Sequence, residues 1–251
     1  MTDERLHQQL DLLQRPTVQL LDDFGAGNAS PGSGSAAALM ALLATKLLTT
    51  VCDKSLTKEE CRAHTTTLTH IKRHVAEIEP RLKELFEKDA REFDQVVALR
   101  IARDKAESSQ EKGKYSRESQ ELLETATDNA FAVIEECMTL IEHGIAVFEH
   151  GWHAVRGDSG AAISVAIASA LSGIFITNLN IKTLKGRKYA KSNLERCAQL
   201  YDRVAEKQSR AIRCVASLNA EATAAVSSAI QVELTESTAI NSSDTPPSPL
   251  N

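Results

Sequence analysis

The sequence predicts an all-α protein, a helical bundle with two buried Ala-rich central helices. Long stretches consist of Ala, Leu, Glu, Lys, Arg and Gln, the residues that lose least on entering a helix. Only Pro16, Pro31 and Pro80 fall within the first 235 residues. No segment alternates apolar and polar residues between turn signals at the spacing of a β-hairpin. These three observations together predict helices throughout.

The apolar pattern places each helix in turn. In the third and fourth helices, apolar residues recur at spacings of three and four, as in Ile71, Val75 and Ile78, which is typical of a half-buried helix. Phe93, Val96, Val97 and Ile101 continue this spacing towards the end of the fourth helix. The predicted helices cover residues 4–14, 34–54, 57–78, 80–107, 115–150, 160–183 and 188–233.

Two of these helices differ from the others in composition. The segments SAAALMALLATKLLTTV (35–51) and SGAAISVAIASALSGIF (159–175) are apolar around nearly their whole circumference and rich in Ala, Ser and Gly. A helix that is apolar all round is buried, and small side chains let neighbouring backbones come close. We expect these helices to form the centre of the bundle, with one of them at the interface of a homodimer.

Composition limits the class of protein. We expect a single helical domain over residues 1–235 and a disordered tail over 236–251, which is rich in Ser, Thr, Asn and Pro.

A net charge of -5 argues against nucleic-acid binding, which needs a concentrated basic face. Five cysteines without a CxxC, and a charged N-terminus without a signal-type core, indicate a cytoplasmic protein. Lys46, and the Ser, Thr and Asn residues of 161–181, argue against membrane spans.

The turn PGSGS (31–35) directly precedes the first Ala-rich helix. The first N–H groups of a helix point outward with partial positive charge, so this turn has the character of a carboxylate- or phosphate-binding site. The alternative is a helix cap in which Ser33 or Ser35 bonds the backbone. No GK[ST] follows, which excludes a Walker loop. From local composition the cap is favoured, and both interpretations stay open.

A second polar cluster flanks the other Ala-rich helix. Asp158 stands where an N-cap residue belongs, so capping and a functional carboxylate are both open. At the far end of this helix, an apolar segment is interrupted by Asn178, Asn180 and Lys182. Polar side chains on a buried helix need hydrogen-bond partners, which are supplied either by the protein or by a bound ligand.

Histidines at 70, 74, 143, 150 and 153 suggest a metal site, but no HExxH is present and surface histidines on a charged helix are commoner. We expect no metal site. No GxSxG elbow marks a nucleophilic serine either.

The two glycine- and alanine-rich segments together resemble the marker segments of the cyclodeaminase/cyclohydrolase family. This family includes the C-terminal domain of formiminotransferase-cyclodeaminase and methenyltetrahydrofolate cyclohydrolases. It has P-G-G-G-S before an Ala-rich helix, and S-D-x-G, a second Ala-rich helix, I-N-L and a K-D turn. KDAREFDQVV (88–97) resembles a third segment, D-A-x-A-F. The order and spacing of the three segments agree over about residues 17–192.

The resemblance implies an all-helical homodimer that binds a folate and needs no tightly bound cofactor. The reaction would be cyclodeamination of 5-formiminotetrahydrofolate or hydrolysis of 5,10-methenyltetrahydrofolate. A fixed carboxylate with a pKa tuned towards neutrality would stabilise the cationic one-carbon centre and move protons. Asp158 and Asp89 are the candidates for this catalytic role. Candidate substrate-binding residues are Gly32, Ser33, Gly34, Ser35, Lys105, Asn180 and Lys182.

The chain departs from the family pattern at several positions. Ser33 replaces the middle glycine, Gly157 the serine before Asp158, and Gly186 the Asp of the K-D turn. Ile176 stands where Asn is usual, and Ala130 near the place of a helix proline. These changes leave two alternatives open. One is imine or amidine chemistry on a non-folate substrate, and the other is a helical binding protein without catalysis.

Overall fold

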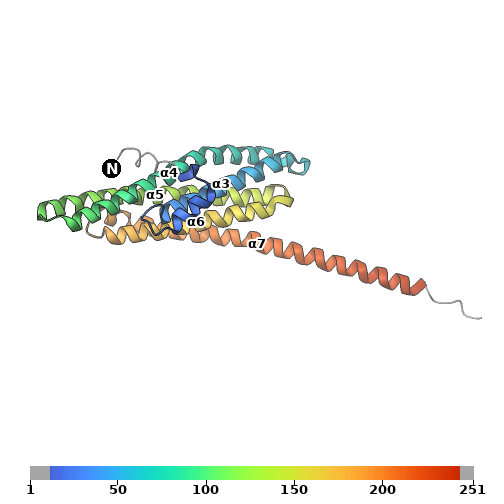
Figure 1. The fold of residues 1–251 in the computed structure, drawn as a ribbon. Coiled ribbons are helices and arrows are strands. Elements are labelled where there is room, and N and C mark those ends of the chain that lie inside the picture. Colours follow the sequence, from blue (N-terminus) through green and yellow to red (C-terminus); the bar gives the residue numbers. More distant parts are fainter. Residues whose placement is uncertain (1–11, 244–251) are drawn as a thin grey trace, which may run out of the picture. The chain divides into compact units, whose positions relative to one another are not determined.

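The computed structural model describes residues 12–243, and their side chains as far as Gln231. All regular structure in this part of the chain is helical (Figure 1), which confirms the predicted fold class. The α-helices are α2 (Thr17–Gly25), α3 (Ser33–Leu56), α4 (Thr65–Lys105), α5 (Ser109–His150), α6 (Arg156–Thr183) and α7 (Lys188–Ser243). Short 3-10 helices cover Leu12–Gln14, Glu59–His64 and His153–Val155.

The chain divides into two units, residues 1–211 and 212–251. The first unit holds α2 to α6 and the start of α7, whereas the described part of the second unit is the remainder of α7. We predicted one domain to residue 235 and a helix ending at 233, but α7 continues to Ser243. The start of the predicted tail is therefore helical, and residues 244–251 lie outside the described residues.

The bundle of the first unit is built from α3, α4, α5 and α6. Helix α5 packs against α4 and α6, and α3 packs against the same two helices and also contacts α5. Large apolar side chains such as Leu48, Phe86 and Phe131 are fully buried between them. The first part of α7 joins the bundle through ion pairs with α5, including Arg203 with Glu135 at 3.4 Å. The burial of these apolar side chains, rather than the ion pairs, is the main source of stability for the long helices of the bundle.

Small residues bring the helices close together. A Cβ on Gly173 would lie 2.5 Å from Ile134 Cγ1, and a Cβ on Gly144 would lie 2.5 Å from Ile163 Cγ1. Both contacts join α5 to α6, so these helices approach where a larger side chain would clash. In addition, the Ser169 hydroxyl on α6 donates a 2.6 Å hydrogen bond to a backbone carbonyl of α3. The composition of the Ala-rich helices therefore serves close packing, as predicted.

Several predicted helix boundaries are wrong. Helix α4 runs through Pro80, where we predicted a break. Proline removes a helical hydrogen bond, but Pro80 is exposed while Ile78 and Leu82 are buried, so packing holds the helix together. Helix α5 starts at Ser109 rather than 115 because Ser108 accepts a hydrogen bond from the Glu111 amide.

The remaining differences lie near chain turns. Helix α2 was not predicted, and the segment expected to be helical from residue 57 begins with the 3-10 helix. Helix α6 starts at Arg156, ahead of the predicted residue 160. Only Leu12–Gln14 of the predicted helix 4–14 lies among the described residues, and it is a 3-10 helix.

Helix α6 has exposed residues at helical spacing from Gly157 to Ala168 and again at Phe175 and Leu179. Phe175 is 72% exposed and Leu179 is 62% exposed, although both are apolar. By length and composition α3 and α6 pass as candidate membrane spans, a property that core helices share. Because three other helices surround α3, its apolar character is explained by the bundle. The exposed face of α6 consists of Gly157, Ala161, Ser164, Ala168, Phe175 and Leu179.

All five cysteines are free and buried. Burial raises the pKa of the Cys52 thiol to about 12, with the charge of Asp53 acting in the same direction. Burial likewise raises the pKa of Cys137 to about 12. These thiols are therefore uncharged at neutral pH and function as small apolar core residues.

Candidate functional site

A pocket of about 570 Å³ lies among four helices of the bundle. It is formed by the N-terminus of α3, the second half of α4, the first half of α5 and the C-terminal end of α6. The volume is in the range of small-molecule sites. The lining residues are Gly32, Ser33, Gly34, Asp89, Phe93, Arg100, Leu123, Ala126, Ile176, Leu179, Asn180, Lys182, Thr183 and Lys185.

The acid of this pocket is Asp89, which is held by the first turn of α3. The Ser35 hydroxyl donates a 2.8 Å hydrogen bond to Asp89 Oδ2, and the Ser35 backbone N–H also bonds the carboxylate. Gly32, the N-cap residue of α3, provides no side-chain cap. Asp89 from the neighbouring helix therefore takes one of the N–H groups that we expected a ligand to use.

Gly34 explains how the carboxylate comes so close to the helix. A Cβ at this position would lie 2.0 Å from Asp89 Oδ1, so any other residue would displace the carboxylate. The glycine of the PGSGS turn thus makes room for a side chain from α4. The predicted cap, in which Ser33 or Ser35 bonds the helix backbone, is not formed, because α3 has no side-chain cap and the Ser35 hydroxyl donates to Asp89. The anion at this helix N-terminus belongs to the protein itself.

Two opposing influences set the ionisation of Asp89. Burial raises the pKa of its carboxyl, and the hydrogen bonds from Ser35 lower the pKa by a smaller amount, so the net direction is upward. An acid in this state both accepts and releases protons more readily near neutral pH than an exposed Asp. A perturbed carboxyl in a pocket is typical of a functional site.

Three cations line the same pocket. Arg100 comes from α4, Lys182 from the last turn of α6, and Lys185 from the turn that follows. None of them forms an ion pair within the described part of the chain. Together with the apolar side chains of Phe93 and Ile176, the lining suits a flat apolar ligand that also bears negative charge.

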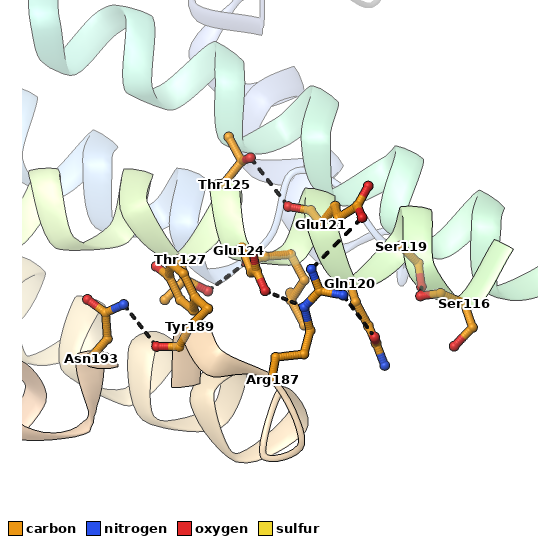
Figure 2. A network of polar contacts seen from close by, with 11 residues as sticks. Ser116, Ser119, Gln120, Glu121, Glu124, Thr125, Thr127, Arg187, Tyr189 and Asn193 are labelled. Atoms are coloured by element: carbon orange, nitrogen blue, oxygen red, sulfur yellow. Dashed lines mark hydrogen bonds and ion pairs between the residues drawn. The ribbon is translucent and has the colours of Figure 1, made fainter. Parts of the chain in front are cut away.

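A polar network holds the turn between α6 and α7, which carries Lys185. Figure 2 shows the Arg187 guanidinium pointing at α5, where it pairs with Glu124 and lies 3.4 Å from Gln120 Oε1. The Arg187 backbone N–H also donates to the Leu184 carbonyl at 2.8 Å. These contacts fasten the turn between α6 and α7 to α5. They therefore fix the segment that carries Lys185.

Most of the predicted site residues come together here. Six of them line the pocket, and Ser35 is buried beside it as a hydrogen-bond donor to Asp89. The other two predicted residues, Asp158 and Lys105, do not line it. The six are Gly32, Ser33, Gly34, Asp89, Asn180 and Lys182.

Asp158 lies at the other end of α6, and the prediction that it caps the helix is wrong. Val155 is the N-cap residue, and Asp158 lies within the first turn. At about 1.5 Å per residue, about 33 Å of helix separates Asp158 from Asn180. Within one chain, its carboxylate is therefore far from the pocket that contains Asp89.

Lys105 is the exposed last residue of α4, and Arg100 takes the place that we expected it to fill. Sequence reasoning missed Arg100, Phe93 and Lys185. A signal for Arg100 was present, because residues 89, 93 and 100 are spaced to lie on one face of a helix.

The histidines of α4 and α5 form a cluster away from this pocket. His143 Nε2 and His74 Nδ1 lie 3.0 Å apart, and burial lowers the pKa of His143 to about 4. In the described part of the chain, no group of three or more His, Cys, Asp or Glu side chains is arranged to hold a metal ion.

The fold and the pocket define a class: all-helical bundle proteins in which a carboxylate and several cationic side chains line one pocket of small-molecule size. The chain belongs to the formiminotransferase-cyclodeaminase family, whose model matches residues 16–199. The family that the sequence resembles is thereby confirmed.

Two relatives illustrate this family. Methenyltetrahydrofolate cyclohydrolase from Methylorubrum extorquens is 27% identical over 190 residues, covering 70% of this chain and 83% of the relative. The crystal structure of formiminotetrahydrofolate cyclodeaminase from Thermotoga maritima matches with a TM-score of 0.71 at 17% identity. That match covers 82% of this chain and 98% of the other, and it supports the fold.

Proposed function

We propose that this protein is a folate one-carbon enzyme that hydrolyses 5,10-methenyltetrahydrofolate or cyclodeaminates 5-formiminotetrahydrofolate. The observation that carries the proposal is Asp89, a half-buried carboxylate with a raised pKa in a pocket that three cations also line. Membership of the family and the likeness to a cyclohydrolase support the same substrate class.

The lining of the pocket matches the two parts of a folate. A flat pterin ring would pack against Phe93, Ile176 and Leu179, which form the apolar wall. The glutamate carboxylates of the folate tail would pair with Arg100, Lys182 and Lys185. The reacting carbon, which lies between the two parts, would then face Asp89.

Asp89 has a role in either reaction. In hydrolysis, water attacks the methenyl carbon and gives one proton to Asp89, which returns that proton to N5 as the carbon–N5 bond breaks. The hydroxyl of the tetrahedral intermediate releases its remaining proton to solvent as the formyl carbonyl forms. In cyclodeamination, N10 attacks the carbon of the protonated formimino group, whose nitrogen already carries two hydrogens. Asp89 then transfers the proton from N10 to that nitrogen, which leaves as ammonia and yields the methenyl cation. Because one carboxyl accepts and donates in turn, a pKa raised towards neutrality serves both steps. Ser35 keeps the carboxylate oriented throughout.

The proposal includes a cytoplasmic homodimer without a tightly bound cofactor. The exposed face of α6 supports dimerisation, because small residues repeat along it at helical spacing and end at Phe175 and Leu179. A second copy of α6 would cover this face with close helix packing. Phe175→Glu would then convert the protein to a monomer, as measured by light scattering. A dimer that survives this change would place the interface elsewhere.

The function is tested by assaying the purified protein separately with both folates. Loss of methenyl absorbance above the uncatalysed rate would identify hydrolysis, and ammonia release from the formimino compound would identify cyclodeamination. Asp89→Asn should lower either rate by about 10²- to 10⁴-fold while the protein stays folded by circular dichroism. If the folded wild-type protein accelerates neither reaction, the folate proposal fails, and a non-folate substrate or a binding role replaces it.

A further inference from the structure

Glu92 on α4 is a buried acid that the proposed reaction does not use. Its side chain is 8% exposed, and it is the only buried Asp, Glu, Lys, Arg or His among residues 12–231. It forms no ion pair in that part of the chain. Its hydrogen-bond donor is the neutral Asn129 amide on α5, which is also buried and lies 2.5 Å from Glu92 Oε2.

Glu92 follows Asp89 by three residues. Residues at this spacing are neighbours on the surface of a helix, so the two carboxyls share one face of α4. Lys88 and Arg91 on the same helix favour the charged form of Glu92, and the charge of Asp89 opposes it. Burial is the largest influence, and it raises the pKa of Glu92.

Asp89 and Glu92 differ in the hydrogen-bond donors that stabilise their charged forms. Asp89 receives a hydroxyl and a backbone N–H from Ser35 at the positive end of α3, and both stabilise its anion. Glu92 receives a single hydrogen bond, from an amide N–H, and Lys88 and Arg91 favour its charged form without forming an ion pair with it, so burial still keeps its pKa raised. Of the two groups, Glu92 is therefore the one whose anion has the weaker hydrogen-bond support.

We propose that Glu92 is a positioning residue that keeps its proton to a higher pH than Asp89 does, so that the Asp89–Glu92 pair carries a single negative charge while Asp89 is ionised and Glu92 is not. A single carboxylate balances a singly cationic one-carbon centre. Ionisation of Glu92 at higher pH adds a second charge beside Asp89, strengthens the hold of Asp89 on its proton and slows proton release. The statements about turnover rest on the proposed function, whereas the pairing of the two acids does not.

The pairing is measured by 13C NMR titration of protein labelled at the glutamate side-chain carboxyl carbons. The Glu92 resonance is assigned by its disappearance in Glu92→Gln, a variant that keeps the carbonyl acceptor for Asn129. We expect Glu92 to titrate well above the ordinary range for Glu, and to move to lower pH in Asp89→Asn. Titration in the ordinary range, or a midpoint that Asp89→Asn leaves unmoved, would overturn the inference.

Asp94→Asn is the matched control. Asp94 lies two residues beyond Glu92, and burial also raises its pKa, but it does not line the pocket. This variant should leave the Glu92 midpoint unchanged. A shift as large as that in Asp89→Asn would show that any neutralised acid on α4 has the same effect, and would also overturn the pairing.

Activity supplies a second readout. In wild type we expect turnover to decline on the alkaline side as Glu92 ionises, and in Glu92→Gln we expect that decline to be lost while the acid limb stays in place. An alkaline limb identical in the two proteins would overturn the role of Glu92 in turnover. If no folate is turned over by any variant, the proposed function fails, and the NMR titration still decides the pairing.

Discussion

The N-termini of α3 and α6 look alike in sequence but differ in the structure. Both helices begin among Gly and Ser residues and continue as Ala-rich segments. At α3 the carboxylate of Asp89 comes from another helix and lines the pocket. At α6 the acid is local, because Asp158 lies in the first turn of its own helix. An acid contributed by a second helix joins two elements at a pocket, whereas a local acid stabilises only the helix that contains it.

The glycines at these two ends give the largest expected contrast. Gly34→Ala would place a Cβ against Asp89 Oδ1, so the carboxylate must move, and we expect turnover to fall by about 100-fold. Gly157→Ala meets no atom within 4 Å and should raise the free energy of unfolding by about 0.4–1 kcal/mol at unchanged turnover. Steady-state kinetics and urea unfolding of both variants test the contrast. Equal loss of activity in the two variants would contradict it.

Removal of the Ser35 hydroxyl should have a smaller effect. Its hydrogen bond favours the charged form of Asp89 and lowers the pKa, so Ser35→Ala should raise that pKa further. The acid limb of the pH–rate profile, where Asp89 becomes protonated, then moves to higher pH. The lost bond should also cost about 1–2 kcal/mol of folding stability. An acid limb that stays in place in Ser35→Ala would show that another group controls it.

Asp158→Ala should have the smallest effect. A negative charge in the first turn of a helix contributes about 0.3–1 kcal/mol through the helix dipole, and thermal unfolding should show a loss of this size. Turnover should be unchanged, because the pocket of the same chain lies at the other end of α6. If Asp158→Ala loses turnover as completely as Asp89→Asn, the assignment of the site to the Asp89 pocket of a single chain is wrong.

The sequence predicts the fold and half of the site, and the unpredicted half depends on topology. Periodicity and composition are local, so they predict the helices well, and they fail at Pro80 where packing from distant residues maintains the helix. Asp89 was predicted because its segment matches a family motif.

Asp158 was also proposed from a motif, but only the packing shows that α6 presents its C-terminal end to the N-terminus of α3. The orientation of neighbouring helices also brings Arg100 and Lys185 to the pocket. No local pattern contains that information.

The buried cysteines have a practical consequence for work on this protein. With all five natural thiols enclosed, and with raised pKa values for Cys52, Cys137 and Cys197, the native protein should react slowly with maleimides. A single cysteine introduced at Ala161 on the exposed face of α6 would then be the fast-reacting position. One spin label or fluorophore could be attached there without first replacing a natural residue, and would report directly on what approaches that face.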